Sequence, residues 1–568
     1  MINVRCIAPL RRAIAKVQSG KAKGAVAEHE KIYIVLACRA RTFPACMILP
    51  SILIGPRTMK IYDLYKPFKN ALRKMALQPA LANIWRYQRL VAAPALIKIP
   101  IRINSSVFEI YVWELHTLCR EILLNASGDE DTLSTPNGLI KMINHIRRIN
   151  EGISERMATS GDAGLRALHT LVHQQARWQY SRDEARLFRA YHIYNDHELA
   201  PIFQQATGLS VRDMFLLSIA MAGSGTRQAG TNASQDYSAF GVSQDARDRF
   251  FTMTGTTLAN IRHRLEGLRR DDEGWEFTWN ALEATPFVNV DDNRTPMFWC
   301  PLPQLLLRRV TEGLFYDLAE GTRTLKINYG NEYGHAFERY VGRIIGEIFQ
   351  APTFSITNEQ PYKIKKAAKH GVDWIVIDST GNLFIECKTR RMKQYAKETS
   401  GSESLDKSLD ELAEAVVQLY ANIDDAIKGK SKWTPNGRPL YPIVVTYEEW
   451  YLLTPHVVET LDEHVRAGLA QRALPKEFME TMPFVVASIN EFEMAAQDIA
   501  YLSIQRFCAA SAAKEYRHFQ LSALAAAEFP TEAKAHRRLL ENSWAEIFPE
   551  MNEWAKMSGM PDDWRDRT

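Results

Sequence analysis

The sequence predicts an α/β domain with a mixed sheet in the C-terminal part of the chain, behind a mainly α-helical N-terminal domain. Three observations support this prediction. Residues 371–389 hold two apolar runs joined by a polar turn. Helix-like and strand-like segments lie on both sides of that stretch. Between about residues 60 and 325, apolar residues recur mostly with helical spacing.

The stretch 371–389 predicts a β-hairpin, because turn-forming residues separate runs rich in Ile, Val and Phe. The turn residues are Asp378, Ser379, Gly381 and Asn382. Side chains alternate across a strand, so Glu386 and Lys388 are expected on one face, with Ile385 and Cys387 on the other. Asp373, at the start of the first run, is then expected near Glu386.

The segments around the hairpin complete the α/β prediction. Periodicity predicts a helix over residues 333–349 and a long amphipathic helix over residues 405–427. Short apolar runs at residues 442–446 and 483–487 predict buried strands. With one further strand expected between the first helix and the hairpin, the predicted order up to residues 442–446 is helix, strand, hairpin, helix, strand.

Two carboxylates on neighbouring strands are suited to a divalent metal. Mg²⁺ prefers octahedral oxygen coordination and usually takes one or two protein carboxylates, with water and phosphate oxygens in the other positions. Such an ion lowers the pKa of a bound water and offsets charge on a phosphate under attack. Lys388 would orient or deprotonate that water, or contact the phosphate. The alternative is a surface hairpin with a Glu386–Lys388 salt bridge, which contributes roughly 0–1 kcal/mol if exposed.

The pattern of Asp373, twelve intervening residues, and Glu386-Cys387-Lys388 resembles the active site of the PD-(D/E)xK, or restriction-endonuclease-like, nucleases. Val372 stands where the proline of that motif would be. The resemblance covers about residues 330–510 and implies an αβββαβ core with Mg²⁺, or Mn²⁺ in its place. It implies that Asp373 and Glu386 bind the metal, that Glu338 of the first helix assists, and that Lys388 positions the nucleophile. Gln418 matches a glutamine that some members carry on the second helix.

Basic residues surround the predicted acidic centre. Residues 363–397 hold nine Lys and Arg against three Asp and Glu. A cationic rim neutralises phosphates with release of counterions, while the acids hold the metal. The residues predicted to contact nucleic acid are Lys365, Lys366, Lys369, Arg390, Arg391, Lys393 and Gln418.

Length and composition predict more than one domain. The chain has 568 residues, of which 46% are hydrophobic and 24% charged, as in a globular protein. Its net charge is only +4, and residues 1–58 alone carry +8, so overall basicity does not indicate nucleic-acid binding. Sparse cysteines without paired spacing favour a reducing, cytoplasmic setting, and no segment has the pattern of a membrane span.

Residues 1–58 differ from the rest in composition and lack clear periodicity. We interpret them as a poorly structured leader and consider Met59 a candidate natural start. The alternatives are a targeting peptide, opposed by Glu28, Glu30 and the length, and a membrane anchor, opposed by Arg39 and Arg41.

The remaining boundaries follow from the patterns. Residues 59–328 are expected to form a helical domain of unknown role, residues 329–515 the nuclease-like domain, and residues 516–568 a helical extension. Within the helical domain, residues 201–215 have a helix-turn-helix outline, but Arg212 is the only cation in its second helix. Residues 490–512 and 532–554 are expected to be helices.

The sequence therefore predicts a metal-dependent nuclease acting on DNA, with RNA not excluded, and analogy suggests a restriction or anti-phage setting. Two alternatives stay open. One is a repair or recombination exonuclease or junction nuclease; the other is a nucleic-acid-binding module without activity. A homo-oligomer or partner proteins are compatible with either.

Overall fold

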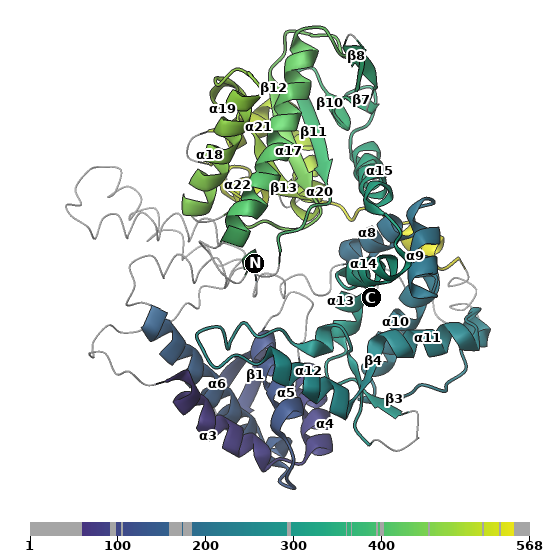
Figure 1. The fold of residues 1–568 in the computed structure, drawn as a ribbon, viewed down its shortest axis with the longest axis vertical. Coiled ribbons are helices and arrows are strands. Elements are labelled where there is room, and N and C mark those ends of the chain that lie inside the picture. Colours follow the sequence, from purple (N-terminus) through teal and green to yellow (C-terminus); the bar gives the residue numbers. More distant parts are fainter. Residues whose placement is uncertain are drawn as a thin grey trace, which may run out of the picture. The chain divides into compact units, whose positions relative to one another are not determined.

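The computed structural model describes residues 60–90, 98–103, 106–157, 173, 184–291, 297–358, 360–364, 366–393, 396–397, 403–452, 455–513, 516–517, 519–532 and 536–549. The chain divides into two compact units (Figure 1). The sheet unit comprises residues 341–537, and the helical unit comprises residues 60–340 together with residues 538–549. The leader predicted at residues 1–58 lies outside the described residues. No helix in the described part of the chain combines the length and apolar character needed to cross a membrane.

A five-stranded mixed sheet forms the centre of the sheet unit, with strand order β13-β12-β11-β10-β7. Strands β7, β10 and β11 pair in antiparallel fashion, whereas β11, β12 and β13 run parallel. The strands are β7 (Ser355–Asn358), β10 (Trp374–Ile377), β11 (Asn382–Lys388), β12 (Leu440–Thr446) and β13 (Val485–Ser488). The predicted α/β class, the hairpin and both later strands are confirmed.

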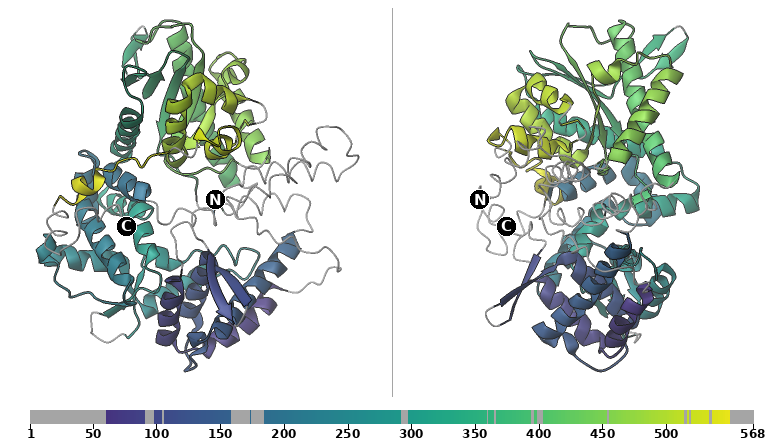
Figure 2. Two further views of the ribbon diagram at one scale, coloured as in Figure 1. Left: turned by 180° about the vertical axis from the view of Figure 1, so that it is seen from behind. Right: turned by 90° about the vertical axis from the view of Figure 1, so that its left-hand side faces the viewer.

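Helices cover both faces of this sheet, as the side view of Figure 2 shows. Helices α17 (Glu403–Ile427) and α18 (Pro455–Gln471) pack on one face, and α20 (Ile489–Leu502), α21 (Ile504–Ala512) and α22 (Leu521–Glu528) lie against the other. A short helix, α19 (Phe478–Thr481), precedes β13. The predicted apolar stripe of α17 is buried from Leu405 to Ile423 and forms one core with Ile375 and Phe384 of the sheet.

Helix α15 (Gly330–Ile348) confirms the helix expected at residues 333–349, but the boundary between the units falls within it. Its first half packs in the helical unit, where Tyr333 contacts Tyr194 and Phe315. In its second half, Gly342 lies against the ring of Trp374 in β10, with no space for a Cβ atom. The boundary expected at residues 328/329 therefore differs from the division at residues 340/341, because each half of this helix has its own packing partners.

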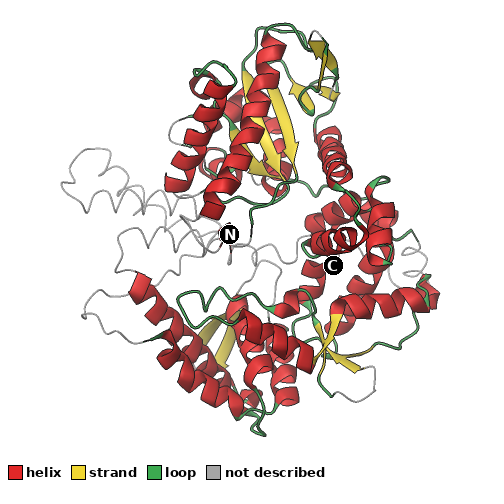
Figure 3. Cartoon of the chain, viewed as in Figure 1, coloured by secondary structure: helices red, strands yellow, loops and turns green. Residues whose placement is uncertain are grey.

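The helical unit is mainly α-helical, as predicted, but it also contains short strands (Figure 3). Its α-helices are α3 (Ile61–Arg73), α4 (Leu77–Gln88), α5 (Val112–Asn125), α6 (Pro136–Met157), α8 (Glu184–Tyr194), α9 (Leu199–Thr207), α10 (Val211–Gly225), α11 (Gln244–Thr254), α12 (Leu258–Leu268), α13 (Gln304–Thr311), α14 (Leu314–Leu325) and α23 (Ser543–Ile547). Strands β1 (Lys98–Ile103) and β2 (Ser106–Tyr111) form a hairpin. Strands β3 (Gly230–Asn232), β4 (Gly255–Thr257), β5 (Phe287–Asn289) and β6 (Met297–Trp299) form a small sheet.

The helix-turn-helix outline is confirmed as α9 and α10. Gly208 adopts the left-handed conformation between them (φ 73°), which glycine reaches without a Cβ clash. Ser210 caps α10 by accepting a hydrogen bond from the backbone N–H of Asp213.

Two helix predictions near the C-terminus are wrong. The helix expected over residues 490–512 is broken at Ser503 (φ 116°), whose side chain caps the separate helix α21. Among the described residues 536–549, helix is limited to α23, whereas a helix over residues 532–554 was expected. There Trp544 packs edge-on against Phe188 within the helical unit.

Candidate active site

The turn of the β10–β11 hairpin is fixed by Asp378. Its Oδ1 accepts hydrogen bonds from the backbone N–H groups of Thr380 (2.7 Å) and Gly381 (2.8 Å). Its Oδ2 accepts from the backbone N–H of Ile504 at the start of α21, at 2.9 Å. Asp378 is buried and fully used in holding this turn. The carboxylates of the hairpin therefore divide into a structural one at the turn and a candidate functional pair at the open end.

Asp373 lies at the open end of the hairpin, immediately before β10. Its Oδ2 accepts a hydrogen bond of 2.6 Å from the backbone N–H of Cys387 in β11. This contact crosses the hairpin and holds the Asp373 carboxylate beside the residue that separates Glu386 from Lys388. The predicted proximity of Asp373 and the Glu386-Cys387-Lys388 segment is confirmed.

Glu386 and Lys388 form an ion pair on the sheet face covered by α17. The Nζ of Lys388 lies 2.7 Å from the Oε1 of Glu386, whose side chain is 1% exposed. The same Nζ donates to Oε1 of Gln418 in α17 at 3.4 Å. Gln418, selected by resemblance alone, is therefore brought to the lysine. The exposed surface salt bridge considered as the alternative is excluded, because the carboxylate is buried.

The charges around Lys388 determine its protonation. Burial of the ammonium lowers the pKa of Lys388, but the attraction of Glu386 and then of Asp373 outweighs this effect and raises the pKa above the ordinary lysine value. Both acids therefore act on one ammonium group. Lys388 is therefore a cation, and it donates hydrogen bonds to Glu386 and Gln418.

Glu338 lies in the first half of α15, which belongs to the helical unit, and its side chain is half-buried. It is four residues before Gly342 and so shares a helix face with that glycine. The structure thus brings together Asp373, Glu386, Lys388 and Gln418 within the sheet unit. The assisting role of Glu338 remains a prediction from the resemblance.

The predicted cationic rim is partly engaged in ion pairs. Arg390 lies 3.0 Å from Glu411 of α17, and Arg391 lies 2.7 Å from Glu448. The guanidinium of Arg391 also stacks over the ring of Tyr447. These ion pairs partly neutralise the two arginines and so weaken their attraction for phosphates. The sequence did not indicate these pairs.

The lysines of the predicted rim are more accessible. Lys366, Lys369 and Lys393 are exposed, with Lys369 in a short hairpin formed by β8 (Tyr362–Ile364) and β9 (Ala367–Lys369). Lys365 lies outside the described residues.

Two carboxylates, the type of group that binds Mg²⁺ or Mn²⁺, lie at the open end of the hairpin. Asp373, immediately before β10, and Glu386 in β11 carry hard carboxylate oxygens, and Mg²⁺ commonly takes one or two protein carboxylates. The described residues contain no cluster of three or more His, Cys, Asp or Glu side chains arranged to hold a metal ion. Water and phosphate oxygens would therefore complete the coordination.

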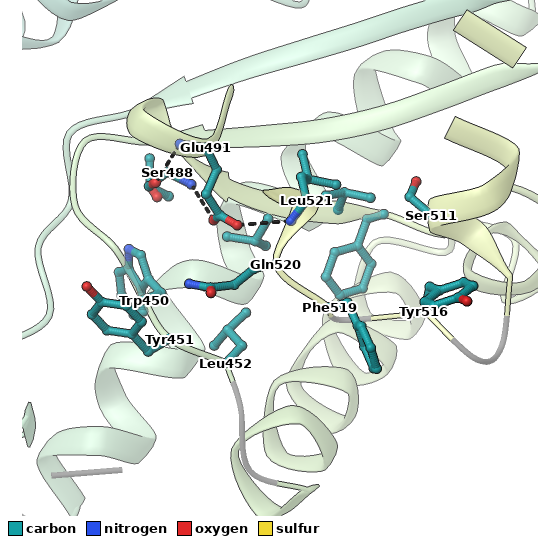
Figure 4. A pocket seen from close by; sticks show the side chains of 14 residues that line it. Trp450, Tyr451, Leu452, Ser488, Glu491, Ser511, Tyr516, Phe519, Gln520 and Leu521 are labelled. Atoms are coloured by element: carbon teal, nitrogen blue, oxygen red, sulfur yellow. Dashed lines mark hydrogen bonds between the residues drawn. The ribbon is translucent and has the colours of Figure 1, made fainter. Parts of the chain in front are cut away.

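A second acidic residue of the sheet unit, Glu491, has a structural role. Figure 4 shows a small pocket, about 30 Å³, beside the ends of β12 and β13, with Glu491 at its wall. The carboxylate accepts hydrogen bonds from the backbone N–H groups of Ser488 and Leu521. Burial, together with the charge of Glu449, raises the pKa of Glu491. These bonds use both carboxylate oxygens to join the start of α20 to α22.

Comparison of the chain with protein-family models, with curated proteins and with solved structures gave no match. The assignment of a function therefore depends on the geometry of this site.

Sequence reasoning did not anticipate one contact that shapes the site. Asn422 of α17 donates from Nδ2 to the backbone carbonyl of Gly371 at 3.2 Å, which ties the helix to the segment leading into Asp373. The only feature of the sequence that points to this contact is that Asn422 follows Gln418 by one helical turn.

Proposed function

We propose that this protein is a metal-dependent nuclease that hydrolyses DNA phosphodiester bonds. The observation that carries the proposal is the meeting of Asp373, Glu386 and Lys388 at the open end of one hairpin, with the acid of the ion pair buried. A buried carboxylate costs free energy unless its charge is used or compensated. The buried Glu386, the half-buried Asp373 and one ammonium together match the chemistry of phosphodiester hydrolysis.

The fold around the hairpin supports the same proposal. Apart from the β8–β9 hairpin, which forms a separate two-stranded sheet between β7 and β10, the succession α15, β7, β10, β11, α17 and β12 follows the αβββαβ order of the restriction-endonuclease-like nucleases that the sequence resembles. In a core of this kind, α17 would cover the reacting edge of the sheet and supply Gln418.

Each residue has a distinct proposed task. Asp373 and Glu386 would hold the metal, with Glu338 assisting directly or through water. Mg²⁺ at this position would lower the pKa of its bound water and offset charge on the phosphate. Lys388, oriented by Glu386 and Gln418, would hold the nucleophile or the phosphate by donating hydrogen bonds. The exposed lysines would bind neighbouring phosphates and make affinity dependent on salt.

The test is cleavage of supercoiled, linear and single-stranded DNA and of RNA, with Mg²⁺, Mn²⁺ or EDTA. Wild type is compared with Lys388→Ala and with the control Lys476→Ala, which removes an exposed lysine between α18 and α19. We expect metal-dependent cleavage that falls about 100-fold or more in Lys388→Ala, as when a residue acting on the transition state is removed, and is retained in Lys476→Ala.

The substrate panel also separates the alternatives. Cleavage of circular DNA indicates an endonuclease, and a requirement for ends indicates an exonuclease of the repair type. Binding without cleavage in any metal, or equal cleavage by wild type and Lys388→Ala, would contradict the proposed roles.

A further inference from the structure

A groove of about 390 Å³ lies on the same sheet face as Glu386 and Lys388. The residues beside it include Ile375 and Phe384, which are cross-strand partners in β10 and β11 and are both buried. Side chains two apart on a strand share a face. Phe384, Glu386 and Lys388 therefore follow one another along one face of β11, with about 7 Å between the Cα atoms of Phe384 and Glu386.

The walls of the groove come from three separate segments. Asn422 and Ala426 belong to α17, and Thr357 belongs to the edge strand β7. The loop after α17 contributes Trp433, whose ring meets that of Phe384 edge to face at 5.2 Å. The volume falls within the roughly 300–1,000 Å³ of small-molecule sites.

The lining combines aromatic and apolar surface with a few amides. The Nδ2 of Asn422 is held by the carbonyl of Gly371, and its Oδ1 is left to accept a hydrogen bond, because its side chain makes no other hydrogen bond within the described part of the chain. Asn358 and Gln360 add exposed amides, and Lys432 adds an exposed cation. Flat heterocycles with N–H groups, attached to an anionic chain, match this set of groups.

We propose that the groove binds an unpaired nucleobase of the strand that is cut, so that the substrate is single-stranded or locally unpaired nucleic acid. This inference rests on the proposed nuclease function, because the groove adjoins the residues assigned to catalysis. Gly371 and Val372, which line the groove, lead directly into Asp373. A base in the groove would thereby fix the register of the phosphate beside the acids. A base inside a duplex cannot reach such a site without leaving the stack.

The test measures binding separately from cleavage. In EDTA, fluorescence anisotropy compares the affinity of wild type for a 12-nucleotide oligodeoxyadenylate and for an abasic strand of the same length and charge. We expect the abasic strand to bind at least about fivefold more weakly, the lower range for loss of one stacking contact. Two substitutions fill the groove: Thr357→Phe and Thr434→Phe, the latter at an exposed position.

The filled variants should bind both strands with the weaker, abasic-like affinity. The control is Ile356→Phe, which adds an aromatic ring to the neighbouring residue of β7 on the opposite face, where the side chain is 36% exposed. A circular dichroism spectrum that matches that of wild type shows that a variant is folded. If Thr357→Phe does not fold, Thr434→Phe still tests the proposal. Equal affinity of wild type for the two strands, or full base preference in the folded filled variants, would overturn the proposal.

The experiments distinguish failure of the base-binding proposal from failure of the nuclease proposal. Mg²⁺-dependent cleavage without any base preference in binding overturns the groove and leaves the nuclease in place. A base preference lost in the filled variants, without metal-dependent cleavage, supports the groove as a base-binding site and contradicts the nuclease.

Discussion

Replacing Lys388 by Met should reveal how strongly the sheet unit depends on the buried ion pair. The substitution keeps most of the side-chain volume but removes the ammonium that lies 2.7 Å from the Glu386 carboxylate. The carboxylate is 1% exposed and the lysine side chain 24% exposed. Breaking a fully buried pair costs roughly 3–5 kcal/mol. Because a quarter of Lys388 is exposed, we expect a loss of about 2–3 kcal/mol.

This loss corresponds to a fall in Tm of roughly 4–12 °C for a unit of this size. Urea unfolding followed by circular dichroism measures the free energy, and a double-mutant cycle with Glu386→Gln isolates the pair. The control is Lys397→Met, which removes an ammonium at the same 2.7 Å distance from the more exposed carboxylate of Glu448. Glu448 also keeps the guanidinium of Arg391 at 2.7 Å, so the loss in this control should be smaller, about 1 kcal/mol.

Metal binding distinguishes a functional acid pair from a structural salt bridge. Lys388→Met makes the site more negative by one charge, so we expect calorimetry to give a tighter Mg²⁺ affinity together with slower cleavage. A coupling energy near zero in the cycle would refute the reasoning about burial. Mg²⁺ affinity that is unchanged or weaker would refute the reasoning about the metal.

Three further predictions concern other positions. Gly342→Ala should destabilise the protein by about 1–3 kcal/mol, because the added Cβ atom clashes with the β10 tryptophan. At Gly346 an added Cβ atom meets nothing within 4 Å, so Gly346→Ala should stabilise the protein by about 0.5–1 kcal/mol. The opposite ranking in urea unfolding would contradict the packing of α15. Asp373→Asn keeps an oxygen acceptor for the backbone but should abolish Mg²⁺ binding in calorimetry, and unchanged binding would remove this residue from the metal site. Burial, with repulsion from a neighbouring glutamate, raises the pKa of Glu276 to about 7 from 4.5, so its protonated form favours the fold: stability should fall, by up to about 3 kcal/mol, as pH rises from 4.5 to 7. Glu276→Gln should flatten this dependence, whereas the exposed control Glu155→Gln should retain it.

The hairpin could be predicted because its determinants are local. Asp378 and Gly381 are turn-forming residues, and the alternation along β11 follows from the period of a strand. The burial of Glu386 could not be predicted, because it depends on α17, a helix that starts fifteen residues after Lys388. The contact between Lys388 and Gln418 was reached through resemblance, since nothing in the spacing between them indicates proximity.

The sequence did not indicate elements whose conformation depends on contacts between residues far apart in the chain. Residues 490–512 have continuous helical periodicity, yet the chain breaks at Ser503 because Asp378, 126 positions before Ile504, accepts the N–H that starts α21. Strands β8 and β9 have three residues each, and Ala367–Lys369 contains no β-branched side chain. Such short strands give no periodic signal, and tertiary contacts decide their conformation.

The location of both acids within one hairpin has a consequence for how the chain folds. The contact from Cys387 to Asp373 closes a separation of only 14 residues, whereas β11 pairs with β12 across 58. Hairpins form in about 1–10 μs, and pairings between distant segments come later. The two negative groups therefore approach each other while still hydrated, where repulsion at 4 Å is about 1 kcal/mol. When α17 later buries Glu386, the counter-charge of Lys388 is already attached to the same strand.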